Sequence, residues 1–168
     1  AANRTRDAET YAGAHLGFRI VHMAQLPKAA LPAPPPLDCT GPNGADAATV
    51  LASQRAWTRH MGAASHEKLF PITEDRKVSV RMVLLPPGKY YQGNPGKGAI
   101  VTLTHPLWVG KYEVTQHQFA SVMGKNPSHF KQEGKNTGVW PVDMVSYLDA
   151  KAFCEKASKN TDARFRLP

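Results

Sequence analysis

The mostly apolar residues 107–112 predict a β-strand, with Leu107, Val109 and Lys111 on one face and Trp108 and Tyr112 on the other. A helix signal follows this strand directly. Thr115 is a good N-cap, and Gln118 three residues later can return a hydrogen bond to it in a capping box. Gly124 is suited to end the helix, because glycine adopts the left-handed conformation without strain. The apolar face of this predicted helix consists of Phe119, Val122 and Met123.

Further strands follow from the same kind of pattern. Residues 78–85 alternate as a half-buried strand does, and a Pro-Pro-Gly sequence then breaks the alternation. A turn rich in Asn, Pro and Gly at 94–98 precedes another short strand at 100–103. A third apolar run at 16–21 is also typical of a strand.

Two more helices are predicted, one over residues 47–61 and one after Ser146. In the first, Trp57 belongs to an apolar stripe and Gly62 ends the helix. This pattern favours a helix docked on the domain body, with a partner-binding helix as the alternative. In the second, Asp149 completes a capping box with Ser146.

Six prolines lie within or just beside residues 26–45, in the sequence HMAQLPKAALPAPPPLDCTGPNG. Proline fixes an extended, polyproline-II-like backbone and cannot donate to a β-ladder. We therefore interpret 26–45 as a Pro-rich linker and 46–77 as a linker helix with its connection. The alternative is that PAPPP is a ligand for an aromatic groove on another protein.

Composition and charge narrow the function classes. Hydrophobic residues make up 42% and charged residues 20% of the chain, which is typical of a globular protein, and no apolar run is as long as a membrane span. The net charge of +8 comes from the part after Asp75. The lysines there stand singly, without a nucleic-acid-binding motif. This favours a solvated surface over a nucleic-acid partner.

Cysteines, histidines and carboxylates are the residue types that most often catalyse reactions or bind metals. The two cysteines leave a disulfide open, but Cys154 lies on the apolar side of a predicted helix and is expected to be a buried small hydrophobe. The seven histidines form no metal-binding spacing, and His117 is expected to be solvated. Asp143 and Asp149 are too isolated in sequence to predict an acid–base pair. No catalytic or metal-binding residue is therefore predicted.

The long polar loop from Gly124 to Trp140 carries three large side chains. They are His129, Phe130 and Trp140. Large amphipathic side chains on a loop are suited to recognition. These three residues therefore make up a candidate binding loop.

Three stretches resemble formylglycine-generating-enzyme-like domains, also called sulfatase-modifying-factor domains. KYEVTQHQFASVMGKNPSHF (111–130) resembles the family signature, and MVLLPPGKYYQG (82–93) resembles its opening hairpin, with Gln92 in place of the usual Met. PVDMVSYLDAKAFCEKASKNTDARFRLP (141–168) resembles the helix that follows and the Arg-Leu-Pro sequence after it. The order of the three stretches is that of the family. The resemblance implies an α+β fold of the FGE-like, C-type-lectin-like kind.

The first residues also resemble this family, but at the other end of its domain. Leu16 to Arg19 resemble its final strand, Leu-Gly-Phe-Arg. We therefore interpret 1–25 as the C-terminal tail strand of one domain and 78–168 as the N-terminal half of another, in a tandem arrangement. Because the family brings its terminal strands together, residues 16–21 are expected to pair with residues 78–85.

The resemblance also implies where the family's chemistry lies. Its copper-binding cysteine pair would stand just before Ala1 and Ala2, and its structural calcium sites would follow Pro168. No cofactor is thus expected within this chain. We expect a non-catalytic recognition or structural module. The alternative is part of an oxidoreductase that converts a sulfatase cysteine to formylglycine.

The Arg-Leu-Pro sequence at 166–168 leads into a further helix in the family. If the domain is incomplete here, the predicted helix after Ser146 keeps an apolar face that the next segment would cover. The expected partners are accordingly a protein or peptide, or another chain that supplies the missing half-domain.

Overall fold

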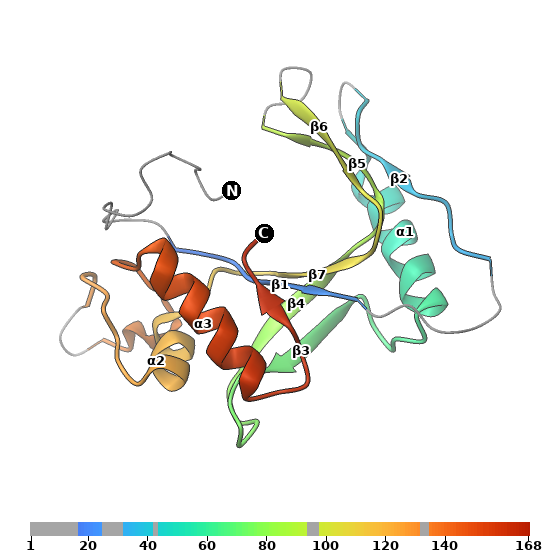
Figure 1. The fold of residues 1–168 in the computed structure, drawn as a ribbon. Coiled ribbons are helices and arrows are strands. Elements are labelled where there is room, and N and C mark those ends of the chain that lie inside the picture. Colours follow the sequence, from blue (N-terminus) through green and yellow to red (C-terminus); the bar gives the residue numbers. More distant parts are fainter. Residues whose placement is uncertain (1–16, 25–31, 42–43, 94–97, 132–134) are drawn as a thin grey trace. The chain divides into compact units, whose positions relative to one another are not determined.

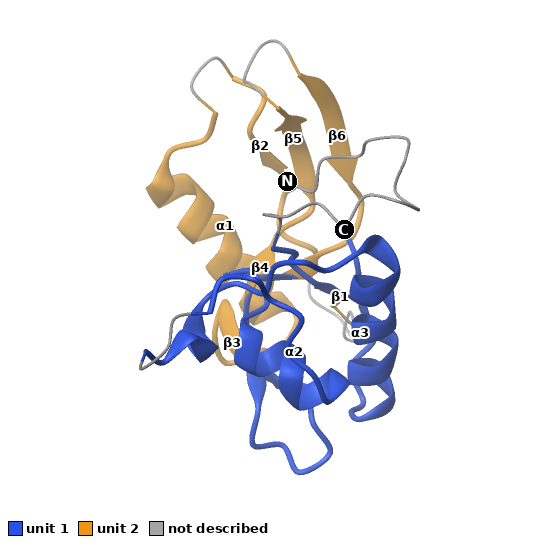
Figure 2. Cartoon of the chain, turned by 90° about the vertical axis from the view of Figure 1, so that its left-hand side faces the viewer, with its two compact units in different colours: residues 1–22, 69–82, 109–168 blue, residues 23–68, 83–108 orange. Residues whose placement is uncertain are grey.

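The computed structural model of the chain describes residues 17–24, 32–41, 44–93, 98–131 and 135–168. The described residues form three α-helices, one short 3-10 helix and two sheets, which confirms the predicted α+β fold (Figure 1). The chain divides into two compact units (Figure 2). Unit 1 consists of residues 1–22, 69–82 and 109–168, and unit 2 consists of residues 23–68 and 83–108. The turn predicted at 94–98 lies mostly outside the described residues.

Every strand of the five-stranded sheet has at least some of its residues in unit 1. Its order is β3-β4-β7-β1-β8. In chain order, the strands are β1 (Val21–Met23), β3 (Glu67–Pro71), β4 (Ser79–Leu85), β7 (Leu107–Gly110) and β8 (Phe165–Arg166). Val80, Met82 and Leu84 of β4 are buried, as their alternation predicts.

The predicted pairing of residues 16–21 with residues 78–85 is wrong. Strand β4 has β3 on one side and β7 on the other, so neither of its edges is free for the tail. The tail lies along β7 instead, where the carbonyl oxygens of Ile20 and Phe18 accept hydrogen bonds from Gly110 N and Val114 N, each at 2.8 Å. The strand itself begins only at Val21, which pairs with Arg166 of β8.

Three phenylalanine rings form the centre of unit 1. Phe119 of α2 (Gln116–Met123) stacks on Phe153 of α3 (Tyr147–Lys159), with ring centroids 5.6 Å apart. Phe18 of the tail meets both rings edge-on, at 6.3 Å and 5.5 Å. Phe119 and Phe153 are fully buried. This cluster therefore joins the tail to both helices through aromatic packing.

Both predicted capping boxes are present. Gln118 N donates to the Thr115 hydroxyl, and Thr115 N donates to the Gln118 side chain. Ser146 and Asp149 make the same exchange before α3. Hydrogen bonds from the hydroxyl and the amide of Ser146 lower the pKa of Asp149. This contribution to stability is therefore present above the ordinary Asp pKa and is lost only as the pH falls through the lowered one.

Unit 2 contains α1 (Ala47–His60) and a three-stranded sheet of order β2-β5-β6, formed by β2 (Leu37–Asp38), β5 (Gly88–Gln92) and β6 (Ala99–Leu103). The hairpin expected over 82–93 is not formed, because β4 and β5 belong to different sheets. The two consecutive prolines between them carry no N–H groups to continue a ladder. Strand β5 pairs instead with β6 over five residues and with β2.

Strand β2 lies in the segment interpreted from sequence as a Pro-rich linker. Its residues follow directly after the prolines and, unlike them, have backbone N–H groups that can donate hydrogen bonds. Leu37 N donates to Pro87 O at 2.8 Å, and Cys39 N donates to Lys89 O at 2.9 Å. The indole of Trp57 in α1, which is buried as predicted, donates to Pro35 O at 3.4 Å. This part of the segment is therefore packed within unit 2.

Gly88 is the position on which the β2–β5 contact depends. A Cβ atom at Gly88 would lie 2.0 Å from Leu37 O, a distance that no real contact has. We predict that Gly88→Ala displaces β2, which removes the backbone hydrogen bond of Cys39. In native protein, thiol labelling of Cys39 should become faster and hydrogen exchange at Leu37 N and Cys39 N should accelerate.

The matched control is Gly41→Ala, where the nearest atom to an added Cβ is 3.8 Å away. Its labelling rate should stay at the wild-type value. Equal rates in the Gly88→Ala variant and the wild type would show that β2 is not held by this approach of two backbones.

Candidate functional site

The candidate binding loop connects α2 to α3 within unit 1 and includes a short 3-10 helix, η1 (Thr137–Val139) (Figure 1). Its large side chains are turned outward. Phe130 is 44% exposed, Val139 70% and Trp140 36%, and His129 is exposed as well. Apolar side chains this exposed do not contribute a core to the chain itself. The backbone beneath them is held by two buried polar residues, Gln116 and Asp143.

Gln116, the first residue of α2, makes the hydrogen bonds that hold the loop together. It is only 1% exposed, and its side-chain amide is fully used. Nε2 donates to the carbonyl oxygens of Phe130 at 2.9 Å and Pro141 at 3.5 Å. Oε1 accepts from Asn126 Nδ2 at 3.0 Å and from the Thr137 hydroxyl at 3.2 Å. One buried amide thus binds four positions of the loop.

The backbone of Gln116 adds a fifth contact, because its N–H donates to Trp140 O at 2.8 Å. Phe130 and Trp140 are therefore held by the same residue, although ten residues separate them. His129 is brought to this place too, since its ring meets the Phe130 ring at 5.4 Å. All three residues predicted for the binding loop lie on this framework.

Asp143 anchors the loop from the other side. It is 6% exposed, and its carboxylate accepts from His129 N at 2.7 Å and from Phe130 N at 3.3 Å. Its own amide donates to the hydroxyl of Ser128 at 3.1 Å. These are the bonds of a structural carboxylate that replaces missing backbone partners in a turn. Asp149, by contrast, accepts from Ser146 N in the capping box of α3. Asp143 therefore holds the loop backbone, and Asp149 holds the start of the helix.

Met144 follows this anchor in a conformation that is unusual for its residue type. Its φ is +57°, in the left-handed region where side chains other than glycine are strained. Strain of this kind costs on the order of 1–3 kcal/mol and persists only where surrounding contacts fix the backbone. The neighbouring Asp143 and Ser146 provide such contacts. Met144 is 37% exposed and adds a fourth apolar side chain next to the loop.

The family resemblance places the copper-binding cysteine pair outside this chain, and neither of the chain's own cysteines, Cys39 and Cys154, is paired. Copper is bound by thiolates. Burial, assisted by the charge of Glu155, raises the pKa of the Cys154 thiol to about 12, so this thiol stays protonated at neutral pH. Cys154 is 2% exposed, which confirms the small buried hydrophobe predicted from its helical position. Cys39 and Cys154 are both free, so the disulfide left open by the sequence is not formed.

Metal and membrane sites were also sought across the described residues. Within 17–24, 32–41, 44–93, 98–131 and 135–168, no group of three or more His, Cys, Asp and Glu side chains could hold a metal ion. In the same ranges, no helix combines the length and the apolar character needed to cross a membrane.

The sequence model of the sulfatase-modifying factor enzyme 1-like domain family (FGE-sulfatase) matches residues 69–168. The chain belongs to this family. The match covers both capping boxes, α2, α3 and the whole candidate binding loop. It begins in β3, nine residues before the boundary expected from sequence.

Two individual proteins are similar to parts of the chain. The Chaperone protein LppX of Paenibacillus barcinonensis is 47% identical over 58 residues, which is 34% of this chain and 19% of that protein. The solved structure of Treponema denticola variable protein 1 has 27% identity and a TM-score of 0.46, over 58% of this chain and 36% of that one. The chain thus spans about a fifth of the length of the curated relative and about a third of the solved one.

The sequence analysis named three large side chains of the loop but not the residues that hold its backbone. Gln116 was not singled out, and Asp143 was considered only as an acid or base. The available signal was the position of Gln116 on the same face as Phe119, one turn earlier, where a polar side chain is expected to be buried with partners.

Gln116 offers a direct test of the loop framework. Gln116→Met keeps the side-chain length but leaves Asn126 Nδ2 and the carbonyl of Phe130 without their partner. Leaving buried polar groups unpaired costs about 1–3 kcal/mol each. We predict that the free energy of unfolding falls by about 2–4 kcal/mol, measured by chemical denaturation. The backbone N–H of residue 116, which donates to Trp140 O, should also exchange faster with solvent.

His117→Gln is the matched control, because His117 is the next residue of the same helix and is exposed. Its effect should stay within about 0.5 kcal/mol. If the two variants have the same stability, the amide of Gln116 does not hold the loop.

Proposed function

We propose that this chain is a non-catalytic recognition module that binds a protein or peptide partner through the loop between α2 and α3. The observation that carries the proposal is the exposure of Phe130, Val139 and Trp140 on a backbone held by buried polar groups. Exposed apolar side chains on a fixed backbone are costly in a free domain unless they serve a contact.

The physics of binding favours such an arrangement. Aromatic side chains supply large contact areas and lose little conformational entropy, and they dominate the binding energy of many interfaces. Gln116 and Asp143 fix the loop backbone before a partner arrives, so little ordering entropy remains to be lost on binding. Strain at Met144 is consistent with the same role, because it is retained next to the loop rather than relaxed.

The similarity to a protein named as a chaperone supports a protein or peptide ligand. That protein is named a chaperone protein, and it is 47% identical to this chain over 58 residues. A peptide with apolar side chains fits the exposed loop better than a polar small molecule, because apolar area is what the loop offers for burial.

A displayed library of random peptides tests the proposal without knowledge of the natural partner. Panning against the purified chain should enrich peptides rich in aromatic and aliphatic residues. Binding of a synthetic enriched peptide should weaken at least about tenfold in the double variant Phe130→Ser, Trp140→Ser, because each is an exposed anchor worth about 1 kcal/mol or more. Fluorescence anisotropy measures the affinity.

Leu69→Ser is the matched control, since Leu69 is 56% exposed on β3 of the same unit and outside the loop. The peptide should bind this variant as it binds the wild type. Equal loss in both variants would point to general stickiness, and unchanged binding by the loop variant would place recognition elsewhere.

A separate test asks whether this chain by itself generates formylglycine. The chain is incubated with copper, oxygen and a peptide that carries a sulfatase-type cysteine. We expect the mass of the peptide to stay unchanged, because Cys154 is buried and protonated and its thiol is therefore a poor copper ligand. A mass shift from the thiol to the aldehyde would support the oxidoreductase instead.

A further inference from the structure

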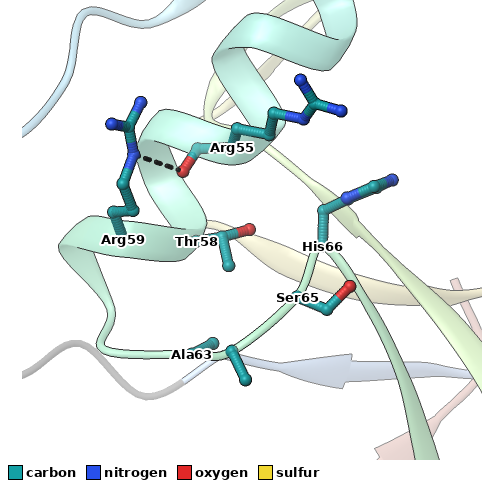
Figure 3. A pocket seen from close by; sticks show the side chains of 7 residues that line it. Arg55, Thr58, Arg59, Ala63, Ser65 and His66 are labelled. Carbon is teal, nitrogen blue, oxygen red and sulfur yellow. Dashed lines mark hydrogen bonds between the residues drawn. The ribbon is translucent and has the colours of Figure 1, made fainter.

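A cavity of about 610 Å³ opens in unit 2, beside the last turns of α1 (Figure 3). Its polar lining comes from Arg55, Thr58 and Arg59 of the helix and from Ser65 and His66 of the segment that follows. The volume is within the range of small-molecule sites. This cavity is separate in sequence from the candidate binding loop, and no part of the proposed function uses it.

The backbone around the cavity is held by hydrogen bonds. Gly62, at φ +66°, ends the helix with its N–H bonded to Arg59 O, and Ala63 N donates to Thr58 O at 3.0 Å. His66 is fixed from its other side, because its carbonyl oxygen accepts from Leu84 N at 2.8 Å. Glu67 N donates to the Ser65 hydroxyl at 3.2 Å. The walls of the cavity are thus defined without a ligand.

The side chains that line the cavity are hydrogen-bond donors with spare capacity. Within the described part of the chain, the guanidinium of Arg55 and the ring of His66 make no hydrogen bond or ion pair. Arg59 donates only through Nε, to Arg55 O at 3.4 Å. In Figure 3, Arg55 and His66 extend to the same side of the helix, and Arg59 turns to the other.

Charge in the cavity is of one sign. Two arginines line it, and none of the residues that line it is an Asp or Glu. Guanidinium groups bind carboxylate and phosphate through paired parallel hydrogen bonds, and a hydroxyl or imidazole can add a third contact. We infer that this cavity binds the carboxylate or phosphate group of a larger ligand, with Arg55 as its main contact and His66 and Ser65 beside it.

A purely structural role accounts for only one of the arginines. Cations stabilise the last turn of a helix through its macrodipole, and Arg59 and His60 occupy that turn in α1. Arg55 lies one turn earlier, where this effect has largely decayed. Arg55 is exposed and its guanidinium serves no carbonyl or carboxylate of the described residues, so it is accessible to an anionic ligand.

Isothermal titration calorimetry at low salt tests the inference with two probes, inorganic phosphate and a hexaglutamate peptide. At least one probe should bind the wild-type chain, and Arg55→Gln should weaken that binding at least about tenfold by removing a charge-assisted bond. Binding of phosphate alone identifies a phosphorylated ligand, and binding of the peptide alone identifies a carboxylate ligand. The melting temperature of the variant should equal that of the wild type.

The control removes two positive charges elsewhere. The double variant Lys151→Gln, Lys156→Gln changes exposed residues of α3 in unit 1. It should weaken binding less than about twofold, because neither lysine lines the cavity and exposed charges contribute little unless they contact the ligand. The inference is overturned if neither probe binds, or if this control weakens binding as much as Arg55→Gln does.

Discussion

The contact among Phe18, Phe119 and Phe153 is the interaction on which the rest of unit 1 depends. The stacked rings set the distance between α2 and α3, and Phe18 adds the tail to the same cluster. Gln116 stands at the beginning of α2 and Asp143 just before α3, so both are positioned by this packing. The loop between the helices is then built on two polar side chains whose places an apolar contact has already determined.

The polar part of this arrangement gains from its surroundings. Gln116 and Asp143 are both nearly inaccessible to water, where hydrogen bonds are stronger and an unpaired group is more costly. Because each of their donors and acceptors has a partner, burial costs little. In the described parts of the loop, 125–131 and 135–145, the backbone is therefore anchored at several points although it contains little regular structure. Such a base allows apolar side chains to remain exposed without the loop collapsing onto them.

Local features of this fold could be read from the sequence, and non-local ones could not. The boxes at Thr115 and Ser146 were predicted because a cap and its partner lie three residues apart. The alternation in β4 likewise identified its buried side. The neighbours of the tail strand were missed, since the choice between β4 and β7 depends on which edge is free in the finished sheet. Strand β2 was missed because the prolines before it predict an extended linker, although Leu37 and Cys39 have N–H groups that can donate to a neighbouring strand.

The position of β1 has a consequence for how the chain is synthesised. His22 and Arg164 are neighbours in space but 142 residues apart in sequence. Contacts of such separation slow folding, because a long loop must close before they form. On the ribosome, β8 cannot be added to β1 until almost the whole of the described chain has emerged. Until then one side of β1 is an open edge, able to pair with another nascent chain. The sheet is thus most vulnerable to misassembly in the interval between the synthesis of β1 and that of β8.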